Sequence, residues 1–211
     1  ILFCVLLNKM YKKLKKLMIV AHPDDELVLG GAELIKNGPE YKVVCISNKN
    51  NKVRRKEFEN VMKKLAVGSY ETWDFQDSLH DYMTSLDENQ AYQEKPFKNL
   101  FSTKWDKIVT HNPIGEYGHP KHKRLFETIK KMCTKFYVFG KSSKKLPDDI
   151  LKKKLELLNL YKSELKTINE LKNKNRDWFK SDNDSNYIEN EIITVYDENL
   201  DKTKYKACYE K

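Results

Sequence analysis

Short apolar runs alternate with segments of helical periodicity along the first two thirds of the chain, and this order constrains the fold more than any other feature. The apolar runs are suited to buried strands and lie at 16–21, 41–47, 70–75, 106–112 and 136–140. The segments with helical spacing lie at 26–36, 53–67 and 121–133. Because the connection between neighbouring parallel strands crosses the sheet through a helix, the order predicts an α/β fold with a Rossmann-like, mostly parallel sheet and helices on both faces.

Polar clusters follow the carboxyl ends of three of these predicted strands. The clusters are His22 to Glu26, Asp74 to Asp77 and His111 to His122. Open parallel sheets bind their ligands outside the carboxyl ends of the strands, near the point where the strand order reverses. We therefore expect the three clusters to meet at one edge of the sheet.

The periodicity changes after the fifth predicted strand. Apolar residues at three- and four-residue steps predict one long amphipathic helix over 146–174, and 187–198 can hold one strand. Segment 76–103 has no clear period and is interpreted as a long loop with one short helix. The fold class is thus an α/β sheet with an added long C-terminal helix.

A chain of 211 residues is long enough for one domain with a sizeable core. We expect an N-terminal extension over 1–15, a single domain over 16–198 and a basic tail over 199–211. Within the domain, the core is predicted over 16–141, and the C-terminal helix and strand over 146–198.

The formal net charge of +9 raises the question of a polyanionic partner. Clustered Lys and Arg attract phosphate groups at long range. Here the basic excess is almost all Lys and is spread along the whole chain, which favours solvated faces, with a dedicated polyanion site as the alternative. No nucleic-acid-binding motif is present, so no nucleic-acid partner is expected.

The N-terminus and the cysteines bear on the compartment. Ile1 to Leu7 is apolar but too short to span a membrane, so either Met10 or Met18 is the true start or the run is the tail of a longer anchor with a basic flank. The four cysteines form no CxxC pair, and two of them lie inside apolar segments. These features favour a reducing compartment, and we expect a cytoplasmic protein, with association with a membrane surface as an alternative.

Two histidine-containing motifs could form a composite metal site at the predicted edge. His22 lies close to Asp24 and Asp25, and "EYGHPKH" supplies His119 and His122. Two histidines and one carboxylate on one side of a metal leave a coordination position open, as catalytic zinc requires. The adjacent carboxylates would then take different roles, one as ligand and one as base. A cluster in which Asp caps the following helix is the alternative, and the residues alone leave both open.

The two motifs together resemble those of a known enzyme family. "AHPDDE" after the first strand and "GEYGHPKH" after a later one are similar to motifs of the LmbE-like family of zinc-dependent de-N-acetylases, which includes N-acetylglucosaminyl-phosphatidylinositol de-N-acetylase. The resemblance covers roughly 16–141. A fainter similarity lies in "KLELLNLYKSE", which resembles the family's downstream Lys, Tyr and Ser pattern.

The resemblance implies a role for each motif residue. The implied Zn²⁺ ligands are His22, Asp25 and His122. Asp24 would be the general base, and Glu26 would position the loop. His119 would stabilise the oxyanion or protonate the leaving amine, helped by the Tyr117 hydroxyl; a loop aromatic packed on the sheet edge is the alternative for Tyr117.

Two substrate contacts are implied more weakly. "VRRKEF" resembles an Arg-x-x-Glu pattern that would place Arg54 against substrate hydroxyls or phosphate, and a solvated helix arginine is the alternative. "WDFQDSLH" would place Asp77 near a sugar, although Gln and Ser stand where the family carries Pro and Gly. His111 has no assigned role, and either a group behind the ligands or a satisfied structural histidine fits it.

The activity implied by the resemblance is removal of the N-acetyl group from an N-acetylglucosamine-type sugar, glycoconjugate or glycolipid by a zinc-dependent hydrolase. One alternative is an LmbE-like amidase or conjugate hydrolase acting on another small amide or a thiol glycoside. Another is a non-enzymatic basic binding protein that retains a zinc site. The expected partner is a small-molecule, glycan or glycolipid substrate, and no feature of the sequence indicates an oligomeric state.

Overall fold

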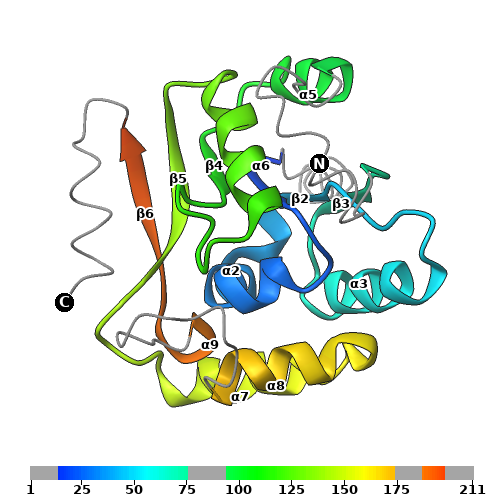
Figure 1. Ribbon diagram of the computed structural model, residues 1–211, viewed down its shortest axis with the longest axis vertical. Coiled ribbons are helices and arrows are strands. Elements are labelled where there is room, and N and C mark those ends of the chain that lie inside the picture. Colours follow the sequence, from blue (N-terminus) through cyan, green and yellow to red (C-terminus); the bar gives the residue numbers. More distant parts are fainter. Residues whose placement is uncertain (1–13, 76–93, 174–186, 198–211) are drawn as a thin grey trace, which may run out of the picture.

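A six-stranded sheet forms the centre of the molecule (Figure 1). The computed structural model describes residues 14–75, 94–173 and 187–197. The strands are β1 (Lys16–Val20), β2 (Tyr41–Cys45), β3 (Ser69–Thr72), β4 (Lys107–Thr110), β5 (Lys135–Lys141) and β6 (Glu191–Asp197). Their order is β3-β2-β1-β4-β5-β6, and all pairs are parallel except β5 with β6. The predicted α/β fold with a mostly parallel sheet is confirmed.

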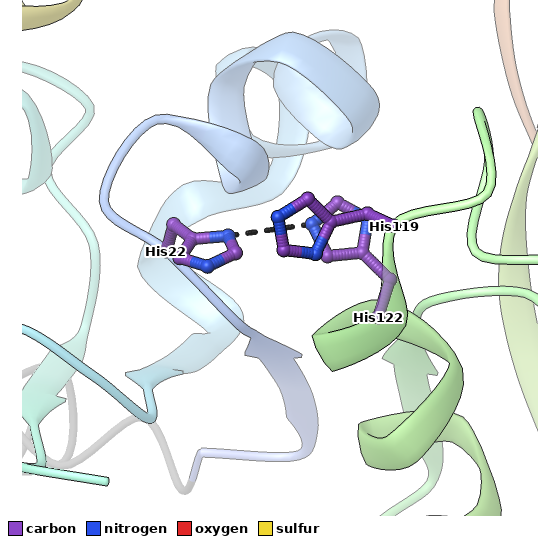
Figure 2. Close-up of side chains that lie close together, drawn as sticks. All are labelled: His22, His119 and His122. Carbon is purple, nitrogen blue, oxygen red and sulfur yellow. Dashed lines mark hydrogen bonds between the residues drawn. The ribbon is translucent and has the colours of Figure 1, made fainter. Parts of the chain in front are cut away.

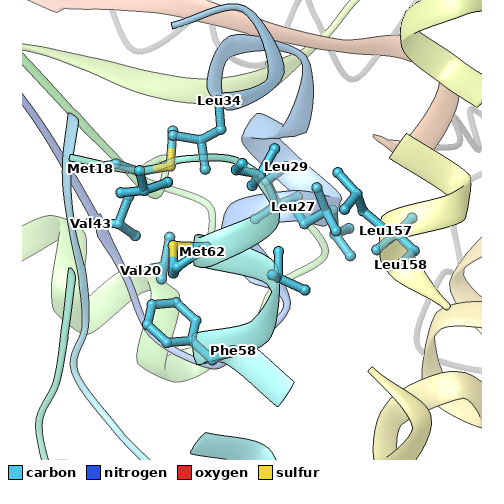
Figure 3. Packing of buried hydrophobic residues seen from close by; sticks show 14 of the residues in the cluster. Met18, Val20, Leu27, Leu29, Leu34, Val43, Phe58, Met62, Leu157 and Leu158 are labelled. Carbon is cyan, nitrogen blue, oxygen red and sulfur yellow. The ribbon is translucent and has the colours of Figure 1, made fainter. Parts of the chain in front are cut away.

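Helices cover both faces of the sheet, because successive strand residues point to opposite faces and both sets are apolar. On β1, Met18 and Val20 face a core formed with α2 (Asp25–Asn37), α3 (Lys52–Lys64) and α7 (Asp148–Leu158) (Figure 3). The alternate residues Leu17 and Ile19 face a second core, formed with α5 (Glu94–Phe101) and α6 (Pro120–Lys130). Each core supplies a firm base for the loops that leave the strand ends.

The segment predicted as one long helix is divided in the structure. It forms α7, a 3₁₀ turn η2 (Lys162–Glu164) and α8 (Leu165–Asn173), and the two helices lie at the bottom of Figure 1, below α2 and α3. The break centres on Tyr161, whose φ of −84° and ψ of 62° are not helical. Its side chain is fully buried, and its hydroxyl donates a hydrogen bond to Glu26. The helical spacing of apolar residues continues through Tyr161. That spacing therefore gave no sign that the chain turns here and places the Tyr161 hydroxyl in the interior.

The C-terminal strand completes the same sheet. A short helix α9 (Tyr187–Asn190) leads into β6, which pairs antiparallel with the whole of β5, from Lys135 opposite Asp197 to Lys141 opposite Glu191. Residues of α7, α8 and α9 also belong to the core on the α2 face. None of the helices in the described part of the chain has the length and apolarity that a bilayer crossing needs.

Candidate active site

Both histidine motifs lie at the point where the strand order reverses. From β1 the chain moves outward to β2 and β3 and then returns to β4, which pairs with β1 on its other side. His22 to Glu26 follow β1 and begin α2, while His111 to His122 follow β4 and begin α6. The predicted meeting of these two clusters is therefore observed. Asp77, from the third cluster, lies outside the described residues.

The three predicted metal ligands present their donor atoms to one another. His22 Nδ1 lies 3.1 Å from Asp25 Oδ2, and His122 Nε2 lies 3.3 Å from the same oxygen. The two histidine nitrogens are 3.4 Å apart (dashed line in Figure 2). In a tetrahedral zinc site with bonds of about 2.0–2.1 Å, ligand atoms are separated by about 3.3–3.4 Å. The three buried side chains thus have the donor set and spacing that fit zinc.

His119 lies beside the ligands but uses one ring nitrogen elsewhere. It is the N-cap of α6, and its Nδ1 accepts the Lys121 N–H at 3.3 Å. Its ring stacks on His122 with centroids 4.5 Å apart and meets the edge of His22 at 4.7 Å (Figure 2). Burial and the neighbouring histidine charges lower the pKa of His119 to about 3. The side chain is therefore a neutral imidazole whose Nε2 carries the hydrogen. Tyr117 packs against the same rings, with its centroid 5.9 Å from that of His119 and 5.4 Å from that of His122.

His111, which the sequence left without a role, is fully buried behind His122. Its Nε2 is 3.6 Å from Asp25 Oδ2, so His111, Asp25 and His122 also have the geometry of a metal-binding group. That nitrogen, however, already accepts the Ala21 N–H at 3.0 Å. His111 is accordingly a satisfied histidine in the wall of the site, as one of the two interpretations of the sequence holds.

Glu116 is the functional candidate that sequence reasoning missed. Although burial opposes ionisation of its carboxyl, the charges and hydrogen bonds of His111 and His122 lower the pKa of Glu116 to about 2. It is part of the "GEYGHPKH" motif, so a carboxylate six residues before a predicted ligand was available as a signal. Carboxylates commonly bind the second nitrogen of metal-ligating histidines.

Asp24 occupies the N-cap position of α2 but does not use its side chain as a cap. Its φ of 115° is in the region that favours glycine, and such strain in a non-glycine residue is concentrated at functional sites. The helix is started by the Asp24 carbonyl, which accepts the N–H groups of Leu27 and Val28. Burial, followed by the neighbouring Asp25, raises the pKa of Asp24 well above its ordinary value. The helix-cap alternative is therefore wrong for this side chain.

Comparison with known proteins identifies the family to which the chain belongs. The family model PIG-L, described as GlcNAc-PI de-N-acetylase, matches residues 17–133, which is more than half of the chain. The chain belongs to the PIG-L family. The segment matched by the family model includes both histidine motifs.

Two further similarities extend the comparison. The chain is 38% identical over 139 residues to the uncharacterized protein L374 of Acanthamoeba polyphaga mimivirus, covering 58% of this chain and 59% of that one. It thus spans less than two thirds of that relative. The crystal structure of the conserved protein TT1542 from Thermus thermophilus superposes with a TM-score of 0.54 at 14% identity. The superposition covers 79% of this chain and 88% of the TT1542 chain, and it shows that the two proteins share a fold.

Arg54 approaches the PIG-L motif from the first turn of α3. Its guanidinium donates to the Pro23 carbonyl at 3.0 Å and lies 3.9 Å from Asp24 and 3.2 Å from Glu164. The side chain is only 15% exposed, so the alternative of a solvated arginine is wrong. Arg54 holds the loop that carries Asp24, and contact with a substrate stays a prediction.

Residues beyond the PIG-L match complete the support of the motif. Glu26 is fully buried, with Oε1 accepting the Tyr161 hydroxyl and Oε2 accepting the Asp24 N–H at 3.1 Å. Burial raises the pKa of Glu26 to about 7. These contacts agree with the positioning role expected for Glu26. Each residue of the downstream Lys, Tyr and Ser pattern forms a hydrogen bond with a buried glutamate. The pairs are Lys154 with Glu191, Tyr161 with Glu26 and Ser163 with Glu57.

Proposed function

We propose that this PIG-L protein is a zinc-dependent de-N-acetylase that hydrolyses the N-acetyl group of an N-acetylglucosamine-type sugar, glycoconjugate or glycolipid. The family match supports a hydrolase of the deacetylase type. The observation that carries the zinc dependence is the spacing of 3.1 to 3.4 Å among one carboxylate oxygen and two imidazole nitrogens. His22, Asp25 and His122 would hold the ion.

Asp24 is the proposed general base. Zinc, when bound, supplies a Lewis acid that lowers the pKa of water and polarises a carbonyl oxygen. The Asp24 carboxylate neighbours the ligand Asp25 and is not used by the helix, so it can take a proton from the attacking water. Burial and the neighbouring Asp25 raise the pKa of Asp24, which strengthens its carboxylate as a proton acceptor. Having gained that proton, Asp24 can give it to the leaving amine.

His119 and Tyr117 are the proposed donors to the tetrahedral oxyanion. A neutral His119 with its hydrogen on Nε2 can donate to a developing negative charge. This tautomer favours oxyanion stabilisation over protonation of the leaving amine, the two roles that the sequence left open. Arg54 and Asp77 are retained as proposed substrate contacts.

The test combines metal analysis with acetate release. Purified protein should hold zinc, measured by elemental mass spectrometry, and should release acetate from some member of a panel of free and lipid-linked N-acetylated amino sugars. Asp24→Asn should lower turnover about 100- to 10,000-fold and keep the zinc, because Asn tolerates a positive φ but cannot take the proton. Asp106→Asn, at an exposed aspartate just before β4, is the matched control and should stay active.

Three outcomes would contradict the proposal. An Asp24→Asn variant with wild-type turnover would show that Asp24 is not the general base. Wild-type protein that binds no zinc would show that the activity does not depend on zinc. If such protein also cleaved no amide, a binding protein would be favoured. Cleavage confined to other amides or thiol glycosides would favour the alternative hydrolase.

A further inference from the structure

A single carboxylate oxygen contacts two stacked histidine rings behind the metal-binding atoms. Glu116 Oε2 lies 3.0 Å from His111 Nδ1 and 2.6 Å from His122 Nδ1. The two rings stack with centroids 3.8 Å apart and planes 25° apart. An ionised carboxylate can only accept hydrogen bonds, so both Nδ1 atoms must carry the hydrogen.

The far side of His111 gives an independent reading of the same tautomer. The Ala21 N–H points at His111 Nε2 from 3.0 Å, which requires a lone pair on that nitrogen. Ala21 immediately follows β1 and precedes His22. His111 therefore joins the loop after β4 to the end of β1, and it can do so only while its hydrogen is held on Nδ1.

The backbone of the loop after β4 positions the Glu116 carboxylate between the two histidine Nδ1 atoms. Asn112 Oδ1 accepts the N–H groups of Ile114 and Glu116, and the Asn112 N–H donates to Glu116 Oε1 at 2.9 Å. Glu116 has a φ of 57°, and Gly115 has a φ of 69°. A side chain at Gly115 would lie 2.6 Å from the His119 carbonyl oxygen. The turn thus folds back on itself and points Glu116 inward, where its side chain has no exposure.

We infer that Glu116 is a positioning residue that fixes both rings, turning His122 Nε2 toward His22 and Asp25 and keeping His111 as a hydrogen-bond acceptor for the backbone. The inference rests on the proposed function, since it treats His122 as a zinc ligand. It also separates the two histidines, because both lie near Asp25 but only His122 has a nitrogen available for the metal.

The binding test uses Glu116→Gln, which keeps the size of the side chain. One of its two oxygens becomes an NH₂ group, which cannot accept the Asn112 N–H or the histidine N–H groups that the carboxylate accepts. We expect the dissociation constant for zinc, measured by competition with a fluorescent chelator, to rise about 10- to 100-fold. Glu127→Gln is the matched control, on the exposed side of α6, and should bind zinc like the wild type.

The spectroscopic test reads the tautomers directly in the wild-type protein. Two-bond ¹H–¹⁵N correlation spectra of histidine rings should show His111 with hydrogen on Nδ1 with and without zinc, and His122 with hydrogen on Nδ1 in the zinc-loaded protein. In Glu116→Gln the His111 signal should move toward a mixture of tautomers. A residue that only filled space would not change this signal.

The outcomes separate the inference from the proposed function. Hydrogen on His111 Nε2, or unchanged zinc affinity in a folded Glu116→Gln variant, would overturn the role of Glu116 while leaving zinc binding intact. Wild-type protein that binds no zinc would overturn the proposed function, and the His111 signal would still decide the role of Glu116. If Glu116→Gln does not fold by circular dichroism, the wild-type ring spectra give the decision.

Discussion

Lys154 and Glu191 form a buried ion pair at a break in helix α2. Gly30 interrupts the helix with a φ of −136° and a ψ of 18°. The Glu191 carboxylate accepts the N–H groups of Gly31 and Ala32, at 3.1 and 2.5 Å. An α7 side chain and a β6 side chain therefore pair with backbone groups of the helix that begins within the His22 to Glu26 motif.

The second residue of the ion pair, Lys154, contacts a backbone carbonyl at the break. Lys154 Nζ donates to the Val28 carbonyl at 2.9 Å as well as to Glu191. The break itself brings α2 close to the sheet, since a Cβ at Gly30 would lie 2.8 Å from the Phe139 ring and 2.9 Å from the end of Met18. The ion pair meets the backbone groups that this close approach leaves without helical partners.

Lys154→Met should strongly destabilise the protein. The change leaves the Glu191 carboxylate buried without its cation, and removing one partner of a buried pair costs about 3–5 kcal/mol. The free energy of unfolding from urea titrations measures the effect. Lys153→Met, at the exposed neighbour on α7, is the control and should stay within about 0.5 kcal/mol of wild type. A loss below about 1 kcal/mol in Lys154→Met would show that the pair does not support the break.

Tyr161→Phe should lower both stability and turnover. The change removes the hydroxyl that donates to Glu26, whose other oxygen holds the Asp24 N–H. A buried acceptor left unsatisfied costs about 1–3 kcal/mol, and looser placement of Asp24 should reduce kcat more than it raises KM. Tyr70→Phe on β3 removes a hydroxyl away from the motif and is the control. Equal losses of stability and turnover in the two variants would show that Tyr161 has no particular role in positioning Asp24.

Much of the fold was predictable from the sequence because strand and helix periodicity follow burial directly. The runs at 16–21 and 41–47 are buried from both faces and became β1 and β2 with only small changes in their ends. The break in 146–174 was not predictable, since the hydrogen bond from Tyr161 to Glu26 joins residues 135 positions apart. Periodicity within a segment carries no information about such a partner.

The candidate site was predictable to the extent that it lies within short motifs. His22, Asp25 and His122 have donor atoms within 3.4 Å of one another, as their placement at one sheet edge implies. Glu116 was missed because its partner His111 lies outside the motif, and the shared oxygen depends on a loop with positive φ angles. Such geometry cannot be obtained from spacing alone.

Zinc should stabilise the folded protein, and the effect should depend on the ligands. A ligand at 100 times its dissociation constant adds about 2.7 kcal/mol to the free energy of unfolding. We expect a chelator to lower the melting temperature of wild type, and His122→Asn to lose the zinc-dependent increase. His119→Asn is the informative control, because Asn can still cap α6 and His119 is not assigned as a ligand. Loss of the increase in both variants would make His119 a ligand.

Glu33 should give an acid-sensitive contribution to stability. Burial alone would raise its pKa, but the Tyr41 hydroxyl at 2.7 Å and the charge of Lys107 outweigh it and hold the pKa of Glu33 below its ordinary value. The contribution is therefore present above the unfolded pKa of about 4.5 and is lost as pH falls through the lower folded value. Wild type should exceed Glu33→Gln in unfolding free energy at pH 7, and the difference should shrink as the pH is lowered below about 4.5. A difference that stays constant with pH would exclude this linkage.

The pairing of the C-terminal strand with β5 also sets an order of events during biosynthesis. The ribosome releases the chain from its N-terminus, so both histidine motifs emerge before Tyr161 and Glu191 do. Until β6 is complete, the amide groups at Gly31 and Ala32 have no carboxylate to accept them, and Glu26 has no hydroxyl donor until Tyr161 emerges. The region that the PIG-L model matches is translated first, but the backbone and side-chain contacts around both histidine motifs are complete only after α7 and β6 have been added.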